Sequence, residues 1–395
     1  MTRPPAGAVL GLAWLLHAAA AAAQDAPVPV SAESLRASVF AIAADSMAGR
    51  ATGSLGDWKA ADWVAAAFRR YRLEPAGEGG SFFQTIPLAF SGPGAPGPGA
   101  RRYAVRNVIA VLRGADPALI QTYVAVSAHH DHIGVRRAAV DHDSTRAFNR
   151  VVRPLGADSP MRPATSEEQV RIGALLDSLR AAHPPRADSI YNGADDDGSG
   201  TALLVELARV LADGPRPRRS ILFVSHAAEE IGLRGSEYFT ENPTVPRDSI
   251  VAELDMDMVG RGGVRDLPGG GPGYLELVGT RRLSTEFGDL IDSIGRQEPV
   301  PFRFDYEYDT PGNPLQYYCR ADHYSYARYG IPSASLSTGE HLDYHQVTDE
   351  PQYLDYHQLA RVTALVRDVA LAVANRERRP AVDGRRQDPT APCRQ

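Results

Sequence analysis

Three histidines and one aspartate crowd into the stretch SAHHDHIG (127–134), directly after an apolar run. A histidine that binds a metal commonly donates its second ring N–H to a carboxylate. Asp131, two residues after His129, is suited to hold that histidine in this way. Because a lone histidine is more often structural than a metal ligand, the interpretation depends on partners elsewhere in the chain.

Two acidic clusters supply such partners: YNGADDDGSG (191–200) and SHAAEEIGLRGSEY (225–238). Adjacent aspartates repel one another unless water or a cation compensates them. An exposed loop with an aspartate capping a helix is the simpler alternative, and a calcium loop lacks its spaced acidic pattern here. Of two adjacent glutamates, one could bind a metal and the other act as a general base. A solvated helix start is the alternative for that pair.

A fourth cluster combines ELDMDMVG (253–260) with GEHLDYHQVTDEP (339–351). Asp257 lies inside a predicted apolar strand, where an unpaired carboxylate would be costly. His341 and His345 both follow another apolar run. Together the clusters form an oxygen and nitrogen donor set without a thiolate, which suits two Zn²⁺ ions sharing a bridging carboxylate. The absence of an HExxH motif excludes a single-zinc site on a helix.

Alternating apolar runs and amphipathic segments must position these residues. The predicted strands cover 107–112, 122–128, 220–227, 249–259 and 332–338. The predicted helices cover 32–45, 56–73, 201–213, 284–297 and 353–377. This alternation indicates an α/β sandwich around a mainly parallel sheet. Ligands of such sheets bind beyond the carboxyl ends of the strands, where several of the clusters lie. The polar interval 135–190, with one predicted helix at 166–182, indicates an insertion and a candidate lid.

The ends of the chain point to export. A basic start, an apolar stretch at 8–23 and small residues before Gln24 predict a signal peptide over 1–23, cleaved near Ala23. The stretch is shorter than the roughly 20 residues that span a bilayer, so no membrane span is expected in the mature chain. We therefore expect a periplasmic or extracellular protein. Cys319 and Cys393 could pair, although the Pro- and Arg-rich segment 376–395 predicts a disordered tail.

Charge excludes one class of partner. The net charge is −6, Lys59 is the single lysine, and the arginines are scattered along the sequence. A nucleic-acid partner is therefore not expected.

Taken together, the clusters resemble the secreted co-catalytic zinc aminopeptidases, whose fold is shared with glutaminyl cyclases and the transferrin receptor ectodomain. The likeness runs from about residue 35 to 375 and is carried by five motifs in the family's order. They are SAHHDH (127–132), GADDDGSG (193–200), AAEEIGLRGS (227–236), MDMVG (256–260) and DYHQVTD (343–349). The resemblance implies the zinc-dependent exopeptidase fold, a three-layer sandwich with a mixed, mainly parallel central sheet, in one domain over 24–375.

The resemblance also implies roles and a substrate. The substrate would be the N-terminus of a peptide or protein, hydrolysed at its first peptide bond with the help of two Zn²⁺ per chain. Glu229 would take a proton from the attacking water and later return it to the leaving amine. Asp131 would hold His129, and Tyr344 would donate a hydrogen bond to the tetrahedral oxyanion. Asp196 would bridge the metals, with a cis peptide to Asp197, and the other ligands would be His129 with Asp257 and Glu230 with His345.

Three alternatives stay open. A glutaminyl cyclase of this fold usually binds one zinc, whereas all five ligand positions are present here. A carboxypeptidase-type metallohydrolase needs a cationic clamp for a carboxylate. A non-catalytic binding relative is disfavoured by the retained Glu229. The sequence departs from the family at His130, Asp197–Gly198 and Gln346, and in the 135–190 insertion, which leaves the substrate preference open.

Overall fold

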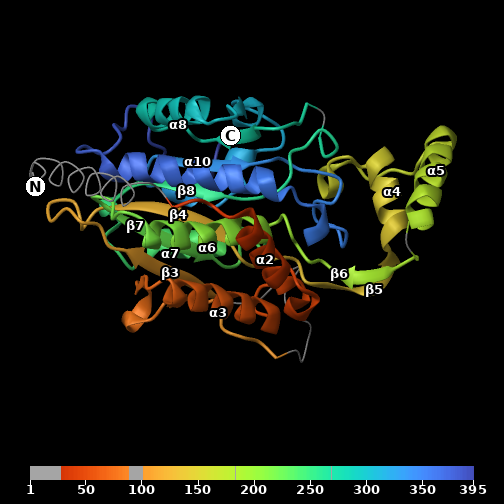
Figure 1. Ribbon diagram of the computed structural model, residues 1–395, viewed down its shortest axis with the longest axis horizontal. Coiled ribbons are helices and arrows are strands. Elements are labelled where there is room, and N and C mark those ends of the chain that lie inside the picture. Colours follow the sequence, from red (N-terminus) through yellow and green to blue (C-terminus); the bar gives the residue numbers. More distant parts are fainter. Residues whose placement is uncertain (1–27, 89–100, 183, 268) are drawn as a thin grey trace, which may run out of the picture.

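Strand β4 (Tyr123–His129) lies near the centre of a nine-stranded sheet in the computed structural model, which describes residues 28–88, 101–182, 184–267 and 269–395 (Figure 1). The predicted signal peptide lies outside the described residues. The strand order is β1-β3-β7-β4-β8-β11-β9-β10, with β2 paired to β3. The strands are β1 (Glu74–Pro75), β2 (Phe83–Thr85), β3 (Arg106–Leu112), β7 (Ser220–His226), β8 (Ile250–Met256), β9 (Tyr274–Val278), β10 (Arg303–Asp305) and β11 (Ser333–Ser337).

The sheet is mixed, as predicted. Strands β7, β4, β8 and β11 run parallel at its centre, and β9 is parallel to β10. Strand β3 is antiparallel to β7, β1 and β2, and β11 is antiparallel to β9. All five predicted strands are present, while β1, β2, β9 and β10 extend the sheet on both sides.

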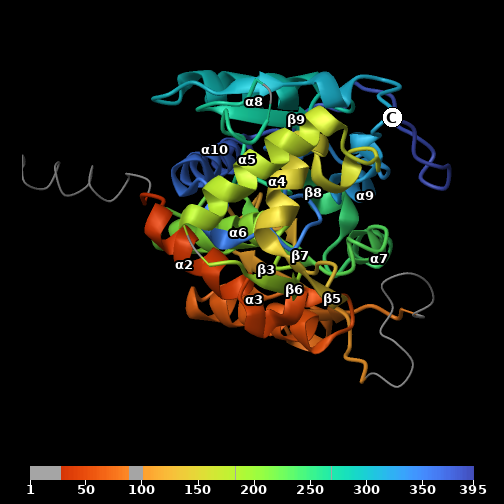
Figure 2. The same cartoon turned by 90° about the vertical axis from the view of Figure 1, so that its right-hand side faces the viewer.

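Helices cover both faces of the sheet, giving the three expected layers (Figures 1 and 2). Val124 and Val126 of β4 join the core under the larger helical layer, whereas Tyr123 and Ala125 join the core on the opposite face. This alternation follows from the two-residue period of a strand, and burial of both faces explains the continuous apolar runs. The larger layer contains α2 (Ala32–Ile42), α3 (Leu55–Arg70), α6 (Gly198–Asp213), α8 (Thr285–Gln297) and α10 (Tyr356–Asn375), and the smaller contains α7 (Arg234–Glu241) and α9 (His323–Ala327).

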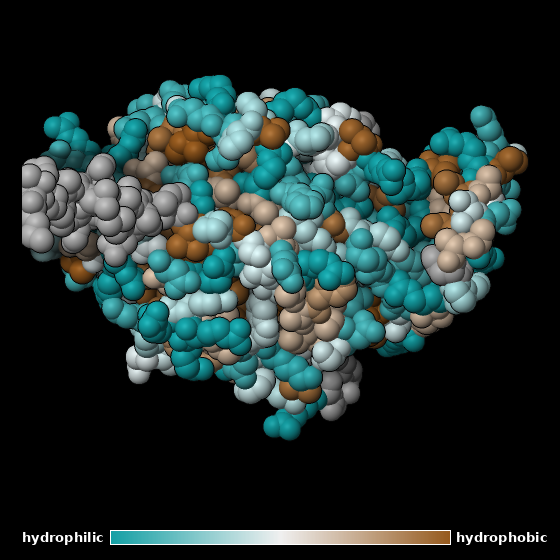
Figure 3. Space-filling model, in the orientation of Figure 1, coloured by the Kyte–Doolittle hydropathy of each residue, from teal (hydrophilic) through white to brown (hydrophobic). Residues whose placement is uncertain are grey.

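Residues 135–190 form a module at one end of the sheet, on the right in Figure 1. A two-stranded antiparallel sheet of β5 (Val135–Asp141) and β6 (Ala187–Ile190) carries α4 (His142–Val152) and α5 (Ser166–Ala182). The side chain of Asn149 donates a hydrogen bond of 3.0 Å to the carbonyl oxygen of Leu342, which joins α4 to the loop after β11. Hydrophilic side chains dominate the face drawn in Figure 3, with brown apolar groups scattered over it, including at the module.

Short 3₁₀ turns complete the described secondary structure. They are η1 (Asp45–Arg50), η2 (Glu78–Gly80), η3 (Gly156–Asp158), η4 (Arg247–Ser249), η5 (Glu307–Asp309), η6 (Tyr317–Cys319) and η7 (Pro351–Tyr353). Among the described residues, no helix combines the length and apolar character needed to cross a bilayer.

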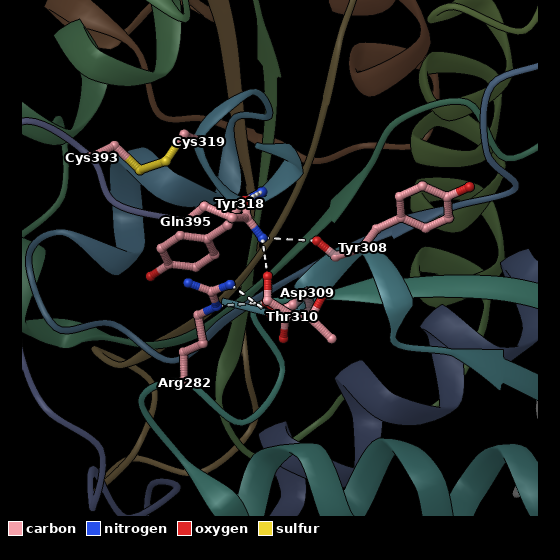
Figure 4. The surroundings of a disulfide bond; sticks show 8 residues. All are labelled: Arg282, Tyr308, Asp309, Thr310, Tyr318, Cys319, Cys393 and Gln395. Carbon is pink, nitrogen blue, oxygen red and sulfur yellow. Dashed lines mark hydrogen bonds and ion pairs between the residues drawn. A yellow bond between two sulfur atoms is a disulfide. The ribbon is translucent and has the colours of Figure 1, made fainter. Parts of the chain in front are cut away.

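The segment 376–395 differs from the disordered tail that we expected. Cys393 is disulfide-bonded to Cys319, and the main-chain N–H of Tyr318 donates a hydrogen bond of 2.9 Å to Oε1 of Gln395 (Figure 4). The Nε of Arg328 donates another, of 2.8 Å, to the carbonyl oxygen of Pro389. Composition alone misses this order, because the attachment comes from one disulfide and from hydrogen bonds in which one partner is a main-chain atom.

Candidate active site

The candidate ligands gather at the edge where the parallel strands end. His129 is the last residue of β4, and Asp257 directly follows the last residue of β8, rather than lying inside the strand as we expected. Glu229 and Glu230 follow β7, and His345 lies in the loop after β11. Asp196 lies in the loop that leads into α6. Because β7, β4, β8 and β11 are parallel, these loops converge at one edge of the sheet.

The side chains form two clusters that share Asp196. In the first, Nε2 of His129 lies 3.3 Å from Oδ1 of Asp196 and 3.7 Å from Oδ1 of Asp257. In the second, Nε2 of His345 lies 2.9 Å from Oδ2 of Asp196 and 3.1 Å from Oε2 of Glu230. The two oxygens of Asp196 therefore face different clusters.

The spacing of these donor atoms fits metal ions. Ligand atoms about 2.0–2.1 Å from a tetrahedral zinc lie about 3.3 Å from one another. The potential ligand atoms within each cluster all lie within 4.8 Å of one another. The buried Oδ2 of Asp196 accepts no hydrogen bond from the described residues, although two histidines flank it. A cation between the donors would compensate this oxygen.

Negative charge dominates the electrostatics of the site. Burial opposes protonation of His129, but the carboxylates of Glu229, Asp131, Asp196 and Asp257 outweigh it and raise the pKa of the ring well above its usual value. Burial likewise opposes protonation of His345, yet Glu230 and Asp196 raise its pKa to about 11. The site therefore favours added positive charge.

Glu229 is placed as a candidate general base between the clusters and the cavity. Its Oε2 lies 3.9 Å from Nε2 of His129, and its side chain is 12% exposed. Burial raises the pKa of its carboxyl well above the usual value, and the charges of Glu230 and Asp257 add to this effect. A carboxylate with a raised proton affinity is suited to accept a proton from water.

Two other aspartates hold His129 and the loops of the candidate metal site. Nδ1 of His129 is 3.2 Å from the main-chain oxygen of Asp131 and 3.7 Å from the Oδ1 of that residue. Asp197 caps α6 and accepts hydrogen bonds from the main-chain N–H groups of His129 and Met258. The peptide bond between Asp196 and Asp197 is cis, which confirms that expectation.

The structure adds two residues that sequence reasoning did not assign to the site. His132 joins the second cluster, with Nδ1 2.5 Å from Oε1 of Glu230. Arg50 is fully buried and donates hydrogen bonds to the main-chain oxygens of Ile42, His130, Asn192 and Gly193. The guanidinium thereby ties the first histidine motif to the loop before Asp196. The motif MAGRATGS (47–54), which contains Arg50, was the available signal in the sequence.

Three residues other than glycine take the left-handed backbone conformation at or beside the candidate ligands. Ala228 (φ 61°) precedes Glu229, Met258 (φ 59°) follows Asp257, and His345 itself has φ 53°. Such conformations are uncommon outside glycine and concentrate at functional sites, where the surrounding structure enforces them.

A cavity of about 320 Å³ opens onto the clusters and contains Tyr344 in its wall. The hydroxyl of Tyr344 accepts a hydrogen bond of 3.0 Å from Nη2 of Arg320, and its ring stacks on His345. Other wall residues include Met258, Val278, Tyr317, Cys319, Ser335, Ser337 and Glu340. Among the described residues, none of the 135–190 module lines this cavity. The module instead contacts the loop that carries His345. The main-chain N–H of Ala157 donates a hydrogen bond to the main-chain oxygen of Tyr344.

The sequence and fold match known proteins. Residues 159–370 match Peptidase family M28, and the chain belongs to this family. Leucine aminopeptidase 1 of Ajellomyces capsulatus is 32% identical over 230 residues, covering 53% of this chain and 55% of that protein. Leupeptin-inactivating enzyme 1 of Streptomyces exfoliatus is 30% identical over 169 residues, covering 42% of this chain and 33% of that protein. The alignments thus span about half or less of these relatives.

Two solved structures share the fold. A zinc aminopeptidase from Bacillus subtilis is 14% identical, with a TM-score of 0.58, and covers 92% of this chain and 100% of that one. A glutaminyl cyclase from Bacteroides thetaiotaomicron is 15% identical, with a TM-score of 0.54, and covers 89% of this chain and 100% of that one. At these identities the likeness establishes the fold.

Proposed function

We propose that the protein is a di-zinc aminopeptidase that hydrolyses the N-terminal peptide bond of peptides. The observation that carries this proposal is the sharing of Asp196 between two donor clusters, with Glu229 beside both. His129 and Asp257 would hold one zinc, and Glu230 and His345 would hold the other, with His132 beside the second ion. The M28 membership and the aminopeptidase relatives support the same activity.

Two bound zinc ions would supply Lewis-acid polarisation of the peptide carbonyl and compensation for developing negative charge. Glu229 would accept the proton of the attacking water and pass it to the leaving amine. Asp131 would hold the His129 ring through Nδ1. Tyr344 already accepts a hydrogen bond from Arg320, so its hydroxyl proton is free to be donated toward an oxyanion in the cavity.

The alternatives have less support. A one-zinc cyclase needs only one donor cluster, whereas two are present. For a carboxypeptidase, Arg320 is the cationic candidate in the cavity wall. However, its guanidinium lies 2.7 Å from Asp158 and is bonded to Tyr344, so its charge is already paired. Export is proposed as well, because a disulfide such as Cys319–Cys393 persists in oxidising compartments.

A substrate panel tests the activity. Peptides with a free amine should be cleaved at the first bond, and the same peptides with an acetylated amine should resist cleavage. If an N-terminal glutaminyl peptide cyclises while the other peptides of the panel are not hydrolysed, the cyclase alternative replaces the proposal. Cleavage of acetylated peptides at the carboxyl end would replace it with a carboxypeptidase.

A further inference from the structure

A second cavity, of about 530 Å³, lies between the 135–190 module and the body of the domain. Helix α4 contributes Arg146 and Arg150 to its walls, and the segment after β8 contributes Arg261 and Arg265. A neighbouring cavity of about 550 Å³ shares Arg150 and Arg265 in its lining. We call the space between these four arginines the arginine cleft.

Among the described residues, carboxylates form ion pairs with two of the four arginines, Arg146 and Arg261. Asp343, buried behind the cleft, lies 3.1 Å from Arg146 and 3.2 Å from Arg261. Asp266, the one carboxylate among the lining residues, lies 2.6 Å from Arg261. Within the described residues, the side chains of Arg150 and Arg265 make no ion pair or hydrogen bond, and both residues are exposed.

The cleft is positive in a chain whose net charge is −6. Burial lowers the pKa of Arg150, and repulsion from Arg146 and Arg261 adds to this effect despite the partial offset by Asp343 and Asp266. Like charges held this closely are unfavourable unless an anion joins them. The repulsion therefore marks the space beside Arg150 as a place that favours negative charge.

We propose that the arginine cleft binds an oxyanion, as a free inorganic ion or as the carboxylate of an organic ligand. Guanidinium groups bind carboxylate and tetrahedral oxyanions through paired N–H donors. Arg150 and Arg265 supply the unpaired donors, while Arg146 is fixed by Asp343 and by its position 3.5 Å from the ring centre of Tyr353. Leu175 and Leu179 of α5 provide an apolar wall for the organic part of a carboxylate ligand. The proposal is independent of the peptidase activity.

Isothermal titration calorimetry of the metal-loaded protein tests the proposal, with sodium sulfate and sodium succinate as separate titrants at constant ionic strength. Sulfate represents an inorganic ion and succinate an organic carboxylate. We expect saturable binding of at least one of them. The double variant Arg150→Gln/Arg265→Gln should bind it at least tenfold more weakly, because each lost guanidinium removes charged hydrogen bonds to the anion.

Arg171→Gln is the matched control, since Arg171 is an exposed arginine of the same module that does not line the cleft. It should bind the anion as the unmodified protein does. Labelling with the arginine reagent phenylglyoxal locates the bound anion. The anion should protect Arg150 and Arg265 from labelling but leave the labelling of Arg171 unchanged. Binding of neither anion, or binding that the double variant retains, would overturn the proposal.

Discussion

Oδ1 of Asp131 accepts a hydrogen bond of 3.1 Å from the main-chain N–H of Glu229. The other oxygen of the carboxylate, Oδ2, accepts one of 2.7 Å from the hydroxyl of Thr52. Since Oδ1 also lies 3.7 Å from Nδ1 of His129, one buried carboxylate contacts both a candidate ligand and the backbone of the candidate base. One residue therefore positions both the candidate ligand and the candidate base.

Asp131→Asn should weaken zinc binding about 10- to 100-fold, as the loss of a ligand's charged hydrogen-bond partner commonly does. The asparagine can still accept the hydrogen bond from Glu229 through its oxygen, so the fold should persist. Competition with a chelator measures the affinity, and Asp213→Asn on the exposed end of α6 is the control. Unchanged affinity would mean that the main-chain oxygen of residue 131 is sufficient to hold His129.

Glu229→Gln should retain both zinc ions and lose about 10²- to 10⁴-fold in kcat, because a positioned general base contributes that much. Metal analysis and steady-state kinetics on one preparation separate the two effects. Glu241→Gln, at the exposed end of α7, should leave kcat unchanged. A fully active Glu229→Gln variant would rule out this residue as the base.

Removal of the metal should abolish peptidase activity and lower the Tm. Without ions, the carboxylates around Asp196 lose their compensation, and a ligand that binds only the folded state stabilises it. Elemental analysis should find about two zinc ions per chain, and added zinc should restore both activity and Tm after chelation. A metal-free protein that remained active would contradict the proposed chemistry.

Arg50→Met should destabilise the fold by about 3 kcal/mol or more. Each buried carbonyl that loses its donor costs about 1–3 kcal/mol, and Arg50 donates to four main-chain carbonyl oxygens. Urea unfolding measures the loss, and Arg70→Met, at the exposed end of α3, serves as the control. A loss as small as that of the control would show that water replaces the guanidinium.

Cys393→Ser should raise KM more than it lowers kcat, because Cys319 lies in the wall of the cavity but does not contact the donor clusters. Stability should fall by about 2–5 kcal/mol, the usual loss when a native disulfide is removed. The double variant Cys319→Ser/Cys393→Ser should match the single one in both measurements. Additive losses would indicate that the two residues act separately.

Sequence patterns predict the central strands well because burial of both faces makes most of their residues apolar, although β8 also buries Glu253 and Asp255. Strand β9 was missed; its run YLELV spans five residues and contains the buried Glu276, whose carboxyl accepts a hydrogen bond from Tyr274. The module strand β5 was missed because it is largely exposed and polar. Helix 166–182 was predicted with the observed bounds.

For the site, the strand ends and motif order indicate which residues meet, but not which atoms face one another. His130 and His132 have similar surroundings in the sequence. In the fold, Nδ1 of His130 pairs with Ser225, whereas that of His132 contacts Glu230. Arg50 could not be assigned either, because its four acceptors are main-chain oxygens, which leave no trace in side-chain identity.

The central position of β4 determines how the site can lose its shape. Strand β4 is hydrogen-bonded to β7 on one side and β8 on the other, so His129 can be released only when the middle of the sheet opens. Amide protons of β4 should therefore exchange with solvent at a rate set by global unfolding. The strands of the module, β5 and β6, pair with each other and not with the central sheet. The module contacts the body through side chains and loops, such as Asn149 with Leu342 and Ala157 with Tyr344, so it can open while the central sheet stays intact. Amide exchange should consequently divide the protein into a slow centre that carries His129 and a faster unit that carries Arg150.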